Sequence, residues 1–231
     1  SSSDDSGRLL TFDPASTHAT VQVSLPVLSL RQKQSGRQFE LQNLIASFNA
    51  VDLRRSATFH LESHVGFAES KSESPVFGTL LSNTTVSNLI GETGQIDLGA
   101  AHYDTNTQVN HVPTKSFDLL IDADDTLSAI LGPFITLKLD GTFSNNQPSN
   151  VDFEISSDNA QIHIPARIGR NVTLRDHVDA TLKTTEQLGP ILFKWGNPLL
   201  ADLADTAEPI KLTIKSEGFR FPIQDFNIRR L

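Results

Sequence analysis

The chain has 231 residues, with 19 Lys or Arg against 27 Asp or Glu and a formal net charge of −8. This acidic balance, with both signs interspersed, argues against nucleic acid as a partner, and the absence of cysteine excludes a disulfide, a thiol nucleophile and a cysteine metal site. No run approaches the roughly 20 apolar residues that span a bilayer. Because methionine is also absent, even at position 1, we expect a processed protein or an excised fragment.

The first third of the chain is predicted to hold a solvated tail, two strands and one helix. Residues 1–8 are small, polar and acidic, and we expect them to be disordered. Apolar and polar residues alternate over Thr17–Leu30, which predicts a strand that Pro26 confines to a sheet edge. Phe39–Phe48 carries apolar residues at the i, i+3, i+4, i+7 spacing of an amphipathic helix. Ser56–Gly66 alternates cleanly and predicts a second strand.

The centre of the chain has the most informative pattern. Residues 117–122 alternate apolar and polar, which predicts a half-buried strand. A short helix, Leu127–Leu131, is expected to follow, with Asp125 or Thr126 as its N-cap. Gly132-Pro133 ends that helix, because glycine tolerates the left-handed conformation and proline cannot donate a backbone hydrogen bond.

The strands after this helix should pair with each other. Leu137–Phe143 and Val151–Ser156 both alternate and are joined by a polar turn-forming segment, so we expect an antiparallel pair. A second Gly-Pro, at Gly189-Pro190, indicates a strand, short helix, strand unit repeated at about 76–110, 117–156 and 172–231. Further strands are predicted at Val76–Leu81, His102–Asn110, Val178–Leu182, Ile210–Lys215 and Phe219–Ile223, and a further helix at Leu199–Asp205.

These elements predict the fold class. We expect a mainly β chain, or β-rich α+β, in which residues 9–231 form a single domain. Its core should be an antiparallel, strongly curved sheet or groove with several short helices, because most strands have one wet face and one dry face.

An enzymatic alternative centres on Asp122. The sequence Ile121–Leu127 resembles the first motif of haloacid-dehalogenase-type phosphotransferases, in which the first Asp is the nucleophile, the second is a general acid and magnesium lies between carboxylates. The catalytic Lys and the paired downstream Asp of that family have no counterpart here, and the rhythm of a parallel sheet is absent. A carboxylate-rich turn that caps a helix explains the same residues, so an Asp-nucleophile phosphatase is a remote alternative and no enzyme is expected.

A metal site is the second polar alternative. His60, Glu62 and His64 share one face of the strand Ser56–Gly66 and carry imidazole and carboxylate ligands. Adjacent members of this set lie about 6.6 Å apart along a strand, which spreads them too far for one ion. A solvated polar face is favoured, and neither a metal ion nor a cofactor is expected.

The aromatic residues point to an apolar function. Fourteen Phe stand against one Tyr and one Trp, and Phe has no polar tip to place at a wet boundary. The Phe residues either fill a core or line a groove for acyl chains. The candidate groove residues are Phe134, Leu137, Leu139, Phe153, Ile155, Leu212 and Ile214.

Several strands resemble a known family. Thr136–Phe143, Val151–Asp158 and Ile210–Phe219, with the short helix that ends in Leu-Gly-Pro, are similar to the C-terminal regions of AsmA-like and TamB-like envelope proteins of diderm bacteria. The resemblance covers about residues 78–231 and rests on the residue pattern of the strands, not on a diagnostic motif. It implies an elongated β-groove in the periplasm or cell envelope that carries or shields lipid in outer-membrane lipid transport or assembly. It also implies no catalytic residues, and membrane association through segments outside this chain.

The sequence therefore predicts a non-enzymatic envelope module that binds lipid acyl chains in an apolar β-groove. Lipid acyl chains or envelope proteins are the expected partners. The alternative is a structural or protein-binding β-sandwich, such as a scaffold or adhesin domain, in which the same apolar faces pack against each other.

Overall fold

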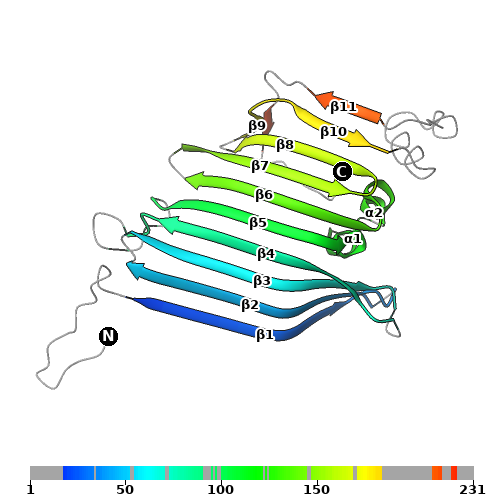
Figure 1. The fold of residues 1–231 in the computed structure, drawn as a ribbon, viewed down its shortest axis with the longest axis horizontal. Coiled ribbons are helices and arrows are strands. Elements are labelled where there is room, and N and C mark those ends of the chain that lie inside the picture. The colour runs from blue at the N-terminus through cyan, green and yellow to red at the C-terminus, as the bar shows by residue number, and fades with distance from the viewer. Residues whose placement is uncertain are drawn as a thin grey trace, which may run out of the picture.

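The computed structural model describes residues 18–33, 35–52, 55–70, 73–90, 95, 97, 100–121, 123, 125–144, 147–168, 171–183, 210–214 and 220–222. Most of them form one antiparallel sheet, as the sequence predicted (Figure 1). Its strands are β1 (Ala19–Arg31), β2 (Gln38–Asp52), β3 (Ser56–Ala68), β4 (Val76–Ser87), β5 (His102–Pro113), β6 (Phe134–Ser144), β7 (Gln147–Ser157), β8 (Ala160–Ile168), β9 (Asn171–Leu174), β10 (Val178–Leu182), β11 (Ile210–Ile214) and β12 (Arg220–Pro222).

Among the described residues, the sheet is a meander whose end strands are β1 and β11. Strands β1 to β8 lie side by side in sequence order, followed by β10 and β11, while β9 pairs with the far end of β8 and with β12. Pro165 lies on β8 between the residues that pair with β10 and those that pair with β9, where its missing N–H costs no ladder hydrogen bond. The edge position predicted for Pro26 is confirmed, because β1 is an end strand of this order.

The register divides the side chains between two faces. Residues directly opposite each other on antiparallel strands point to the same face, so rows of partners can be followed across the sheet. One such row, which we call the central row, is dominated by apolar and hydroxyl side chains and consists of Val23, Ala46, Leu61, Ser82, Thr107, Leu139, Phe153 and Ile164. We call its face the apolar face. The opposite, polar face carries Glu62, Gln108, Lys138, Glu154 and His163 in the neighbouring row.

The helix predicted over Phe39–Phe48 is wrong, because this segment belongs to strand β2. Asn43 adopts a positive φ of 52°, and the register with β3 shifts between Gln42 and Ile45. This bulge inserts one extra residue and places both Leu41 and Leu44 on the apolar face. Two apolar residues three apart in sequence therefore imitate the spacing of a helix.

The strand predicted over residues 117–122 is also wrong. Helix α1 (Thr114–Ile121) occupies this segment and helix α2 (Thr126–Leu131) follows it. Packing on the sheet overrides the alternation: Phe117 and Leu119 lie against the buried residues at the ends of strands β2, β3 and β5. The α2 helix and its stop are confirmed, with Gly132 at a positive φ of 92° and its N–H donated to Ser128 O at 2.9 Å.

The described residues include only part of the remaining predicted elements. Strands β4, β5, β6, β7, β10 and β11 confirm the corresponding predictions, including the antiparallel pair of β6 and β7. In the first expected copy of the repeat, β4 continues to Ser87 and Asn88 takes a positive φ of 56°. The tail 1–8, the helix Leu199–Asp205 and Gly189-Pro190 lie outside the described residues, so the threefold repeat stays a prediction.

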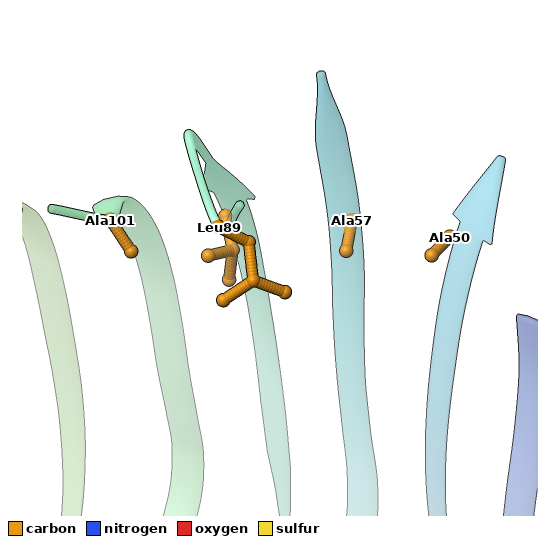
Figure 2. Packing of buried hydrophobic residues seen from close by; sticks show 5 residues of the cluster. Ala50, Ala57, Leu89 and Ala101 are labelled. Atoms are coloured by element: carbon orange, nitrogen blue, oxygen red, sulfur yellow. The ribbon is translucent and has the colours of Figure 1, made fainter. Parts of the chain in front are cut away.

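Buried residues gather at the two ends of the apolar face. At one end, α1 and α2 cover Phe39, Val65, Val109, Val112 and Ile135, and the lower strands in Figure 1 bend near this end. At the other end, Leu89 and Ala101 pack over Ala50, Ala57 and Val86 (Figure 2). The middle of the face lies between these two clusters.

Candidate functional site

The candidate site is the middle of the apolar face, along the central row. No member of the central row is buried: Val23 is exposed, and the other seven are partly exposed. Phe59, which lies next to this row, retains 38% of its surface. With strands about 4.8 Å apart, a row across eight strands runs for about 34 Å. This length exceeds the roughly 15 Å that an acyl chain spans in half of a bilayer core.

Four of the predicted groove residues meet on this face. Leu139 pairs with Phe153 in the central row, and Leu137 pairs with Ile155 one row closer to the helices. Leu137 and Ile155 are partly buried against the cluster around Leu131 and Ile135. These four residues therefore form one continuous strip that runs from the helix-covered end into the open middle.

The other predicted groove residues are placed differently. Phe134 lies on the polar face, one residue before Ile135, and stacks on His111 with ring centroids 4.1 Å apart. It therefore does not join the strip. In β11 the backbone register places Leu212 opposite Ala180 and Ile214 opposite Val178, but the side chains of β11 lie outside the described part of the structure.

Sequence reasoning missed the contribution of β2 and β3. Leu44 and Ala46 of β2 and Phe59 and Leu61 of β3 extend the apolar face toward β1. The alternation of β3 was visible in the sequence, but β2 carried the misleading helical spacing. In β2 the bulge was indicated only by Asn43, since asparagine is among the residues that tolerate a positive φ.

Hydroxyl groups occupy the apolar face where it crosses β4 and β5. Ser82 Oγ lies 2.7 Å from Thr107 Oγ1, and Thr84 Oγ1 lies 2.8 Å from Thr105 Oγ1. Each hydroxyl therefore has a hydrogen-bond partner on the neighbouring strand, and the threonines can present their methyl groups. The central row carries no charged side chain, so its chemistry is that of a neutral, mostly hydrocarbon surface.

The polar face has opposite chemistry. Lys138 Nζ lies 3.9 Å from Glu154 Oε2, and His163 Nε2 lies 3.5 Å from Asp152 Oδ1. A depression of about 480 Å³ opens here over β6, β7, β8 and β10. Two cross-strand rows line it, one neutral and one charged: Thr136, Ser156, Gln161 and Thr181, and Lys138, Glu154, His163 and Asp179.

An ionic cluster fixes the helices over one end of the apolar face. Arg37, just before β2, bonds Asp125 at 2.5 Å and Glu69 at 3.2 Å, and Lys115 of α1 also bonds Glu69. The hydrogen bond to Asp125 raises the pKa of Arg37 above its ordinary value, so its charge is secure. Because these contacts join both helices to the ends of β2 and β3, they hold the cover in place.

A side chain of α1 caps the first turn of α2, although Asp125 occupies the N-cap position. The carboxylate of Asp118, which is 2% exposed, accepts hydrogen bonds from the N–H groups of Leu127 at 2.8 Å and Ser128 at 2.9 Å. The prediction that Asp125 or Thr126 caps this helix is wrong, since Asp125 makes no side-chain cap bond and pairs with Arg37 instead.

The polar alternatives find little structural support. Asp122 lies outside the described residues, but the segment before it is helix α1 in an antiparallel fold, whereas the phosphotransferase motif needs a strand of a parallel sheet. His60 bonds Asn83 at 2.8 Å on the polar face. Among the residues that the structure describes, no group of three His, Asp or Glu could hold a metal ion, and no helix is long and apolar enough to cross a membrane.

Fold and site together define an open antiparallel sheet with one partly covered apolar face. The comparisons with known proteins add no family to this description. No protein-family model, curated protein or solved structure matches the chain.

Proposed function

We propose that this chain is a non-enzymatic module that holds lipid acyl chains against the apolar face of its sheet. One observation carries the proposal: the central row is uncharged, mostly apolar and not buried across eight strands, although both ends of the same face are covered. Soluble monomers rarely leave a continuous apolar surface of this extent to water without a use for it.

The mechanism would be passive. An acyl chain laid across the strands removes its methylene groups and the row beneath them from water, and each fully buried methylene contributes about 0.8 kcal/mol. The polar head group would stay in solvent beyond the rim of the sheet. Transport or shielding of lipid in the periplasm or envelope of a diderm bacterium is consistent with this chemistry and with the resemblance to AsmA-like and TamB-like strands.

The β-sandwich alternative needs a second sheet against the apolar face. In the described part of the chain, only α1, α2 and the segment that contains Leu89 and Ala101 pack on this face, and each covers one end. The partly exposed middle therefore favours a groove over a closed sandwich. A scaffold function would leave Leu139 and Phe153 in contact with water and without a partner.

Lipid binding can be tested with two adjacent residues of β6 that point to opposite faces. Leu139 belongs to the central row and Lys138 to the polar face. We expect phospholipid or fatty acid to copurify with the protein in native mass spectrometry. After delipidation, Leu139→Gln should weaken binding of a fluorescent fatty acid by about fivefold, which corresponds to about 1 kcal/mol of lost apolar contact.

Lys138→Gln is the matched control and should leave the affinity unchanged. Circular dichroism should confirm that both variants keep the strand content of the parent chain. A delipidated protein that binds no acyl probe, or equal losses in the two variants, would contradict the proposal.

A further inference from the structure

Strand β1 is a long edge strand with exposed apolar side chains. Within the described residues, β2 pairs with one side of β1 and no strand pairs with the other (Figure 1). Its six large apolar residues keep 41–55% of their surface exposed, and in its 13 residues the only charge is Arg31 at the end. Edge strands of soluble monomers normally carry charges or other features that block further pairing. Apart from Pro26, β1 lacks such protection.

Five of the six large apolar residues of β1 lie on the apolar face, whereas Val27, opposite Gln42, lies on the polar face. Leu25 pairs with Leu44 and Leu28 pairs with Leu41, and the bulge at Asn43 puts both partners on that face. The alternation of β1 therefore inverts near Pro26, so that two apolar sets lie on one side of the strand. These are Val21, Val23 and Leu25 before the inversion, and Leu28 and Leu30 after it.

This arrangement is close to a palindrome about the middle of the strand. If a second β1 runs antiparallel with its centre between Leu25 and Pro26, Val21 meets Leu30 of the second copy and Val23 meets Leu28. On the other face Gln22 meets Ser29 and Ser24 meets Val27, while Leu25 meets Pro26 at the centre. Arg31 falls opposite Thr20, so no like charges face each other. Self-complementarity of this kind is the requirement of an interface between two identical subunits.

We propose that two copies of this chain associate through β1, antiparallel and about a twofold axis perpendicular to the sheet. Such an axis keeps both apolar faces on the same side, so the two sheets become one and the two central rows become continuous. Pairing adds a backbone ladder and shields the exposed apolar side chains of each β1. Pro26 has no N–H, so it leaves at most one hydrogen bond per copy unmade near the centre, and the rest of the ladder can form.

The register of this interface can be tested directly because the chain contains no cysteine. Single-cysteine variants Val23→Cys and Leu28→Cys are mixed and oxidised. We expect a disulfide-linked dimer from the mixture, since directly opposed residues bring their Cβ atoms within about 5.5 Å. Each variant alone should crosslink weakly. A mixture of Val23→Cys and Gln22→Cys is the matched control, and it should also crosslink weakly because these residues are not opposed.

The oligomeric state provides the second measurement and does not depend on lipid. Size-exclusion chromatography with light scattering should give twice the chain mass at micromolar concentration. Val23→Lys should give monomers, and adding Leu28→Glu to that variant should restore the dimer through two Lys–Glu pairs across the axis. A parent chain that stays monomeric, or equal crosslinking of every cysteine pair, would overturn the proposal and leave the proposed lipid binding to stand or fall by its own test.

Discussion

At the scale of single residues, Asp118 joins the two helices. It is buried, and its two oxygens accept hydrogen bonds from two successive N–H groups at the start of α2. These bonds satisfy donors that a helix start leaves without a partner. We expect Asp118→Ala to lower the free energy of unfolding by about 2 kcal/mol, because it removes the cap and leaves the two amides unsatisfied.

Chemical denaturation followed by circular dichroism measures this loss. Glu154→Ala is the control. Glu154 is exposed, and its ion pair with Lys138, at 3.9 Å, contributes less than about 1 kcal/mol. Asp118→Asn should fall between the two, since one acceptor oxygen remains. Equal stability of Asp118→Ala and Glu154→Ala would show that α2 does not need this cap.

At the scale of elements, the bulge in β2 decides which side chains reach the apolar face. Asn43 takes a positive φ, a conformation that a β-branched residue adopts only at a cost of about 1–3 kcal/mol. We expect Asn43→Val to destabilise the chain by about 2 kcal/mol and Asn43→Gly to be close to neutral. Thermal and chemical unfolding of the purified variants measure both effects.

The matched control is Asn49→Val, in the same strand. Asn49 is exposed and does not have a positive φ, so valine should fit the strand there and change stability by less than about 0.5 kcal/mol. If valine were tolerated equally at both positions, the bulge could not be the feature that sets the register of β2.

The same bulge shows why the sequence predicted most strands but not this one. Regular alternation was enough to predict β3, β6 and β7, and with the turn between them the antiparallel pairing of β6 with β7. One inserted residue turns a two-residue period into a three-residue step, which a helix also produces. The strand predicted over residues 117–122 was wrong for a different reason. The alternation there is real, but the contacts of Phe117 with the sheet favour helix α1.

The sequence could predict which face of its own strand each site residue occupies, but not how those residues line up across the sheet. Alternation places Leu137, Leu139, Phe153 and Ile155 on one face of their strands. It cannot show that Leu61 and Ala46 continue the same row, since that depends on the register of five intervening pairings. The openness of the middle of the face depends on what packs over it, which no local pattern records.

At the scale of the whole molecule, the two faces of the sheet differ in charge, so ligands bound to them should respond differently to salt. The central row has no charge, whereas the polar face places Lys138, Glu154 and Asp179 around its depression. A ligand held by hydrocarbon contact should be insensitive to ionic strength, while a ligand held by the polar face should weaken as salt screens the charges. Salt dependence therefore reports which face a lipid uses.

Chain length provides the second variable. An open sheet covers one side of an acyl chain, so each added methylene should contribute about half of the 0.8 kcal/mol of full burial, or about a twofold gain in affinity. We expect a series of saturated fatty acids to follow this slope in isothermal titration calorimetry, with a negative heat-capacity change and little response to salt. An affinity that ignored chain length but fell with salt would assign the ligand to the polar face, because there charged side chains line a depression.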